Sequence, residues 1–245
     1  MLSEEEMERR RRERLRQLRR EQAKKKRQRE LFRRTVIITV AVLLMAGVFF
    51  TVCKIRDSHA ASAETYPAKI IENAPDYTVD LLDINEYSRP GSALKTVNGI
   101  VIHYTANPGT TAKQNRDYFN GLKDSHLTKA SAHFVIGLDG EIVQCIPCKE
   151  IAYASNERNS DTIAIECCHE DKTGKFNPET EQSLVELTAW LMGRYGLTTK
   201  DVIRHYDVTG KECPLYYVKN EDQWNDFLDR VNRYIEKYGV EPQTN

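Results

Sequence analysis

The feature that most constrains this chain is a run of 19 residues without a single charge, from Thr35 to Cys53. An arginine pair at positions 33–34 precedes the run and Lys54 follows it. As an α-helix, a run of this length extends about 28 Å, close to the thickness of the hydrocarbon core of a bilayer. A helix buried in a protein core usually keeps a polar stripe, and this run has none. We therefore expect residues 35–53 to form a transmembrane helix.

The distribution of charge predicts how that helix is oriented. Residues 1–34 contain 15 Lys/Arg and 7 Asp/Glu, whereas residues 54–245 contain 21 and 29. The positively charged flank of a span stays in the cytoplasm, so we expect a single pass with the N-terminus inside and the body of the chain extracellular. A cleaved signal peptide is the alternative, because Ala61-Ser62-Ala63 resembles a cleavage site. That triplet lies well beyond an apolar run that is itself longer than usual for a signal peptide, which favours an uncleaved signal anchor.

The basic segment 1–34 is rich in helix formers and too poor in apolar residues to bury a core. A solvated cytoplasmic segment that fixes topology and touches anionic lipid head groups explains this composition. A nucleic-acid-binding arm is an alternative. No residues suited to reading bases accompany the basic ones, so we expect no nucleic-acid partner.

Beyond the apolar run, residues 54–76 are small, polar and unpatterned, which predicts a linker. Residues 77–240 have a globular texture and are numerous enough for one hydrophobic core. Alternating strands and helices favour an α/β domain with a single mixed central sheet flanked by helices. The expected strands are Gly99–Tyr104, Ser131–Gly137, Glu141–Ile146 and Thr162–Cys167, the second and third joined by a turn at Asp139-Gly140.

Three helices are expected in this domain. The first is capped by Thr111 and runs to about Leu122. The second has Asn177 as its N-cap, Pro178 in its first turn and Gly196 after its end. The third covers residues 221–238. Apolar residues recur at helical spacing in the last two helices, so we expect them to face the core rather than a ligand: Leu184, Leu187, Leu191, Tyr195, Trp224, Phe227, Leu228, Val231 and Ile235.

Two histidines and a cysteine occur in informative settings. His103 ends the buried strand IVIH, and His205 follows Val202-Ile203-Arg204 and precedes a polar loop that reaches Cys213. Two imidazoles and a thiolate would suit Zn²⁺ and leave a fourth position for water. Histidines a hundred residues apart are usually unrelated, so spacing alone is weak evidence.

Four blocks, IVIHYTANPG, SAHFVIGLDGEIVQCIP, DTIAIE and RHYDVTGKECP, occur in this order between about residues 97 and 214. Together they resemble the zinc-dependent N-acetylmuramoyl-L-alanine amidases of the type 2 family. That family includes bacteriophage and bacillus-type cell-wall amidases and peptidoglycan recognition proteins. The resemblance covers most of the outer domain and neither the apolar run nor the linker. It implies hydrolysis of the amide bond between N-acetylmuramic acid and L-alanine in peptidoglycan.

The resemblance also implies roles for single residues. It implies a Zn²⁺ ion held by His103, His205 and Cys213. Glu166 matches the family's acidic residue near the metal, and alternation directs it away from the core that Ile163 and Ile165 fill. A carboxylate there suits general acid–base catalysis. Lys211 matches a position that faces the developing oxyanion. The alternatives are that Glu166 only balances charge at a strand end and that Lys211 is a solvated loop lysine.

The chain departs from its relatives at two places. Ala132 stands where some relatives place a tyrosine near the metal, which shifts the catalytic weight to Glu166. Tyr153 to Asn156 stand where several relatives carry a histidine, so we expect different contacts to the glycan or stem peptide. Asn107, Asn156 and Arg158 are the candidates for substrate contact. His133 is expected to be a hydrogen-bonded structural residue, and no role is assigned to His59, His126 or His169.

Four further cysteines of the outer domain, Cys145, Cys148, Cys167 and Cys168, leave several alternatives open. Outside the membrane they could form disulfides, with three complete pairings. Cys145-x-x-Cys148 is also the spacing of a redox or metal motif, although no second such pair accompanies it. Cys145 and Cys167 fall on expected strands, which favours one cross-strand bridge or simply buried thiols.

Two function classes compete. One is an enzyme, a peptidoglycan amidase. The other is a non-catalytic peptidoglycan-recognition module, because some family members bind muropeptides without cleaving them. Loss of the cysteine-position ligand is the usual route to a pure binder, and here His103, His205, Cys213 and Glu166 are all present, which favours the enzyme. An unrelated zinc hydrolase on the same scaffold is a third possibility.

Overall fold

The computed structural model describes residues 69–242. The expected cytoplasmic segment, the transmembrane helix and residues 54–68 of the linker lie outside the described residues. Within residues 69–242, no helix combines the length and the apolar character needed to cross a membrane.

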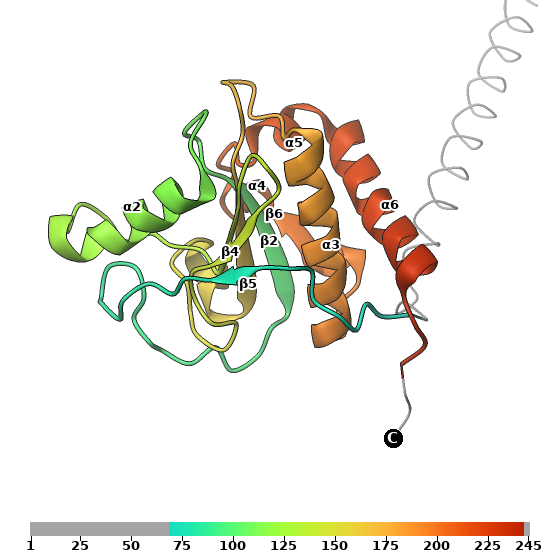
Figure 1. Ribbon diagram of the computed structural model, residues 1–245, viewed down its shortest axis with the longest axis horizontal. Coiled ribbons are helices and arrows are strands. Elements are labelled where there is room, and N and C mark those ends of the chain that lie inside the picture. Colours follow the sequence, from blue (N-terminus) through green and yellow to red (C-terminus); the bar gives the residue numbers. More distant parts are fainter. Residues whose placement is uncertain (1–68, 243–245) are drawn as a thin grey trace, which may run out of the picture. The chain divides into compact units, whose positions relative to one another are not determined.

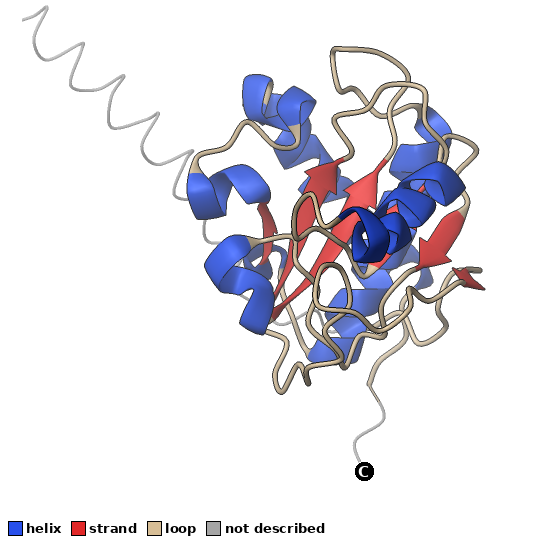
Figure 2. Ribbon diagram, turned by 90° about the vertical axis from the view of Figure 1, so that its left-hand side faces the viewer, coloured by secondary structure: helices blue, strands red, loops and turns tan. Residues whose placement is uncertain are grey.

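One six-stranded sheet forms the centre of the domain (Figure 2), with strand order β1-β4-β3-β5-β2-β6. All neighbouring strands are parallel except β3 and β4, which form the expected antiparallel hairpin. The sheet is therefore mixed, as the sequence predicts. The strands are β1 (Thr78–Val79), β2 (Gly99–Tyr104), β3 (Phe134–Ile136), β4 (Ile142–Gln144), β5 (Thr162–Cys167) and β6 (Val202–Arg204).

Helices cover both faces of the sheet (Figure 1). On one face α3 and α6 lie side by side, and their apolar residues pack on Ile100, Ile102, Ile163 and Ile165. On the other face α2 packs through Phe119 and Leu122 against Val135 and Ala164. The helices are α2 (Ala112–Ser125), α3 (Pro178–Tyr195), α4 (His205–Thr209), α5 (Leu215–Lys219) and α6 (Glu221–Tyr238), with 3₁₀ turns η1 (Asn156–Ser160) and η2 (Thr199–Asp201).

The helix ends that the sequence predicts from capping residues are confirmed at the start of α2 and at both ends of α3. Asn177 accepts the backbone N–H of Thr180 at the start of α3, and Gly196 ends the helix in the left-handed conformation that glycine adopts without strain. Thr111 caps α2 with a reciprocal bond to Gln114, and that helix continues to Ser125, three residues beyond the expected end. The predicted core faces of α3 and α6 are buried or packed on the core.

Three boundaries differ from expectation. Residues 131–133 are not part of β3, and the N–H group of Ser131 donates to the carbonyl of Tyr153, which lies outside the sheet. The strand expected at residues 141–146 is shorter in the structure, where β4 covers only Ile142–Gln144. The end of the expected linker 54–76 belongs to the folded unit: Ile70 forms a bridge with Val240, and Ile71 packs against the core.

Candidate metal centre

The sheet topology brings His103 and His205 to the same edge. His103 is the fifth residue of β2, and His205 begins α4 directly after β6. Strands β2 and β6 are parallel, with Ile102 opposite Arg204, so the residues that follow each of these lie next to one another. The loop after α4 then turns back, and the N–H of Tyr206 donates to the carbonyl of Cys213 at 2.9 Å. The third candidate ligand thus arrives at the same edge.

The three side chains converge on one point. One candidate ligand atom from each of His103, His205 and Cys213 lies within 4.8 Å of the other two. The Sγ atom of Cys213 is 3.8 Å from Nδ1 of His103, and the two imidazole centres are 4.7 Å apart. This is the convergence that the sequence comparison implies for residues far apart along the chain.

All three side chains are buried, and this controls their ionisation. Burial, reinforced by the positive charge of Lys211, lowers the pKa of His205, and burial holds the pKa of His103 well below its usual value. Burial also raises the pKa of the Cys213 thiol to about 12. Neutral imidazoles offer lone pairs to a metal, and a nearby divalent cation favours the thiolate.

Glu166 lies beside this cluster. It is paired in register with His103 across β2 and β5, on the sheet face opposite Ile163 and Ile165, as alternation predicts. Its Oε2 atom is buried and has no hydrogen-bond partner among the described residues. Burial raises the pKa of Glu166 to about 8, and the charge of Lys211 partly offsets this effect.

The residues fit a zinc ion on two grounds. Two imidazoles and a thiol are a donor set that Zn²⁺ prefers, and three protein ligands leave a position free, as in catalytic sites. In addition, a buried carboxylate oxygen without a partner, such as Oε2 of Glu166, is costly unless a cation or hydrogen-bond donor accompanies it.

Lys211 is exposed on the loop between α4 and Cys213. Its backbone N–H donates to Thr209 Oγ1, and its charge is close enough to act on His103, His205 and Glu166. The side chain is therefore near the cluster and open to solvent, which a residue that meets a substrate requires.

The three candidates for substrate contact have different positions. Asn107 is exposed on the loop that follows β2, at the same sheet edge as His103. Asn156 instead directs Oδ1 to Nε2 of His205, at 3.1 Å. The structure does not bring Arg158 to the cluster. Its guanidinium pairs with Asp161 and lies against Gly99, about 13 Å along β2 from His103 at 3.3 Å per residue.

Sequence reasoning missed Ser155. This residue is fully buried, and its Oγ lies 3.1 Å from Nε2 of His103. The only signal was its place in the segment 153–156, where the chain departs from its relatives.

The remaining polar candidates are confirmed as structural or stay without a role. His133 is buried, with its Nε2 2.9 Å from the carbonyl oxygen of Glu150 and its Nδ1 accepting the N–H of Ala164. The cysteines at 145, 148, 167 and 168 are free thiols. Cys145 and Cys167 belong to the clusters on opposite faces of the sheet, so a bridge between them is excluded.

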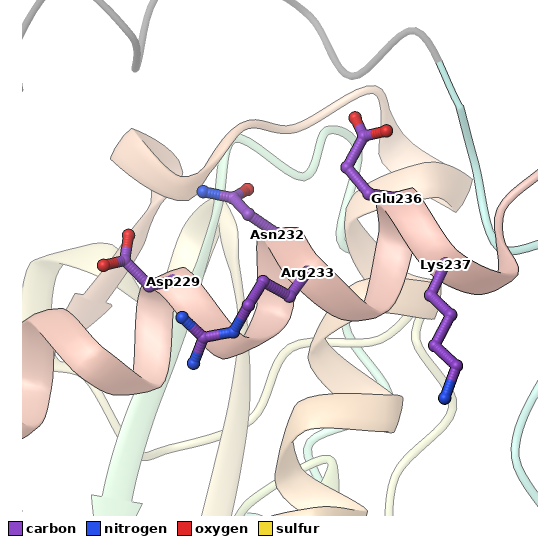
Figure 3. A pocket seen from close by; sticks show the side chains of 5 residues that line it. All are labelled: Asp229, Asn232, Arg233, Glu236 and Lys237. Carbon is purple, nitrogen blue, oxygen red and sulfur yellow. The ribbon is translucent and has the colours of Figure 1, made fainter.

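A separate pocket lies on α6, where five exposed side chains line it: Asp229, Asn232, Arg233, Glu236 and Lys237 (Figure 3). It shares no residue with the cluster at His103 and is not the site that the sequence predicts.

Comparison with known proteins gives a consistent result. The sequence profile of one family, described as N-acetylmuramoyl-L-alanine amidase, matches residues 93–215, half of the chain. N-acetylmuramoyl-L-alanine amidase CwlL of Bacillus licheniformis is 39% identical over an alignment of 169 residues, and the match covers 64% of this chain and 46% of that protein. N-acetylmuramoyl-L-alanine amidase BlyA of Bacillus subtilis (strain 168) is 33% identical over an alignment of 176 residues, and the match covers 63% of this chain and 46% of that protein. The chain thus spans about half the length of the curated relatives it matches.

Solved structures agree in fold. The catalytic domain of XlyA matches with a TM-score of 0.54 and 27% identity, over 64% of this chain and 99% of that domain. PlyL matches with a TM-score of 0.56 and 23% identity, over 64% of this chain and 97% of that one.

Proposed function

The chain belongs to the N-acetylmuramoyl-L-alanine amidase family, and from that membership we propose that it hydrolyses the amide bond between N-acetylmuramic acid and L-alanine in peptidoglycan, with zinc as cofactor. The convergence of His103, His205 and Cys213 within 4.8 Å is the observation that carries this proposal. When bound, zinc supplies a Lewis acid that activates water and polarises a carbonyl group.

The residues of the chain supply the proton transfers and charge compensation. Glu166, paired with His103 across β2 and β5, takes a proton from the attacking water. The water oxygen bonds to the carbonyl carbon, the C–N bond breaks, and the same carboxyl group passes the proton to the alanine nitrogen. The ammonium group of Lys211 stabilises the negative charge that develops on the carbonyl oxygen. Asn107, exposed on the loop after β2, is the remaining candidate for a substrate contact.

A non-catalytic peptidoglycan-recognition module is the competing function. The complete set of His103, His205 and Cys213, with Glu166 beside it, favours the enzyme. A pure binder has no use for an unpaired carboxylate held next to three metal-binding side chains, since burying it costs free energy.

We further propose that residues 35–53 anchor the protein in the cytoplasmic membrane, with residues 1–34 inside and the amidase domain outside. The uncharged run of 19 residues and the basic character of residues 1–34 support this. Peptidoglycan, the proposed substrate, lies outside the cytoplasmic membrane, on the side where this orientation would put the amidase domain.

Mass spectrometry of purified muropeptides incubated with the zinc-loaded chain tests the reaction. We expect free stem peptides with an N-terminal L-alanine. Binding without cleavage would favour the recognition module, and cleavage at another bond would favour a different zinc hydrolase.

A further inference from the structure

Two successive residues on one short segment each approach a different imidazole of the cluster. Ser155 Oγ lies 3.1 Å from Nε2 of His103, and Asn156 Oδ1 lies 3.1 Å from Nε2 of His205. In both rings the contacted atom is Nε2. In His103 the other ring nitrogen, Nδ1, is the one that Cys213 Sγ approaches. A single turn of chain therefore meets the outer side of both rings.

The segment is itself held in place. The side chain of Asn159 accepts the N–H groups of Ala154 and Ser155, at 2.9 and 2.6 Å. Asn156 has a φ of +52°, in the left-handed region that asparagine tolerates better than most residues. These features fix the backbone so that the consecutive side chains of Ser155 and Asn156 both point to the cluster.

The chemistry of these contacts sets the tautomer of each imidazole. The amide oxygen of Asn156 only accepts hydrogen bonds, so Nε2 of His205 must carry the proton and Nδ1 keeps its lone pair. The hydroxyl of Ser155 can accept from Nε2–H of His103 in the same way, which leaves Nδ1 of that ring, 3.8 Å from Cys213 Sγ, free to bind. Partners of this kind orient metal-binding histidines and increase their affinity.

We propose that Ser155 and Asn156 are positioning residues for the metal centre: each fixes one histidine with Nδ1 directed at the ion. This inference rests on the proposed zinc-dependent function. It assigns Asn156 to the metal centre in place of the substrate contact that the sequence suggests.

The test is the zinc affinity of the full-length chain, measured by competition with a chromophoric chelator. Asn156→Gly removes the amide and tolerates the positive φ, and Ser155→Ala removes the hydroxyl from a fully buried position. We expect each variant to bind zinc about 10- to 100-fold more weakly. Asn156→Asp, which keeps an acceptor oxygen, should restore affinity to near the wild-type value. His126→Gly, at another residue with positive φ, is the matched control and should bind zinc like the wild type.

Two further readouts separate positioning from folding and from catalysis. The metal-free variants should stay folded, with a single cooperative unfolding transition, and Co²⁺ bound in place of zinc should show an altered visible spectrum in Ser155→Ala and Asn156→Gly. Wild-type affinity and spectrum in either variant would overturn the role of that residue, whatever the activity. A wild-type chain that binds zinc without cleaving muropeptides would refute the proposed function alone, and one that binds no zinc would overturn both.

Discussion

His103 and Glu166 are directly paired in register on the neighbouring parallel strands β2 and β5. Register partners project from the same face of a sheet, so the carboxyl group and the imidazole share one surface at the edge where both strands end. The arrangement joins a candidate metal ligand and a candidate general base through the backbone pairing of the sheet.

Glu166→Gln tests the general-base role, since the amide keeps the shape and loses the basicity. We expect a rate of muropeptide cleavage about 10²- to 10⁴-fold lower, with zinc content unchanged. Glu170→Gln, at an exposed carboxylate outside the cluster, is the matched control. An unchanged rate in Glu166→Gln would remove Glu166 from the mechanism.

Lys211→Met tests stabilisation of the oxyanion, because it keeps the length of the side chain and removes its charge. A charge that acts only as the carbonyl oxygen becomes negative should affect kcat more than KM, and we expect kcat to fall about 10²- to 10³-fold. Steady-state kinetics of Lys211→Met and of Lys172→Met, an exposed lysine in a turn, provide the comparison. Equal kinetics in the two variants would show that Lys211 is a solvated surface residue.

Because His133 is buried, we expect the domain to lose stability in mild acid. Burial lowers the pKa of His133 to about 4, although its contact with Glu150 acts the other way. The unfolded chain therefore binds a proton near pH 6.5 that the folded chain excludes until about pH 4. The free energy of unfolding should fall as the pH decreases through this window, by up to roughly 3 kcal/mol from this group.

Urea unfolding of wild type and His133→Gln between pH 7 and 4.5 isolates this contribution, because other buried histidines remain in both. The variant should lose less stability on acidification, whereas His126→Gln, at an exposed residue, should behave as the wild type. Identical pH profiles for wild type and His133→Gln would contradict the assignment.

The proposed anchor predicts that the full chain resists extraction from membranes by alkaline carbonate. Two arginines in place of Leu43 and Leu44 should release it, since each charge near the centre of a span costs about 2.5–3.5 kcal/mol. Serine at the same two positions is the control for altered side-chain volume. Recovery of the wild-type chain in the soluble fraction would refute the anchor.

The elements that the sequence predicts well are those with explicit local signals. Asn177 and Gly196 mark both ends of α3, and the apolar runs of β2 and β5 match the observed strands residue for residue. Strands β1 and β6 have two and three residues, which is too short for a recognisable pattern of apolar residues. Their pairing partners are distant in the chain, so no local signal marks them either. The end of the expected linker differs from the structure for a similar reason, because Ile70 forms a bridge with Val240, which is distant in the chain.

The residues of the candidate site also differ in how well the sequence predicts them. Motif resemblance identifies His103, Glu166 and Cys213. The parallel pairing of β2 with β5 explains why His103 and Glu166 meet, and the bond from Tyr206 N–H to the carbonyl of Cys213 brings the cysteine to the same edge. The roles of Ser155 and Arg158 depend on how the chain turns through η1, which sequence spacing does not encode. That turn directs Ser155 into the cluster and Arg158 toward Asp161.

The most direct test of the account is the zinc content of the purified chain together with the X-ray absorption fine structure at the zinc edge. We predict one zinc per chain, with one sulfur at about 2.3 Å and two imidazole nitrogens at about 2.0–2.1 Å. In Cys213→Ser the sulfur contribution and the hydrolysis should both be lost while the domain stays folded. A chain without stoichiometric zinc, or a zinc ion without a sulfur ligand, would contradict the metal centre on which the proposed function rests.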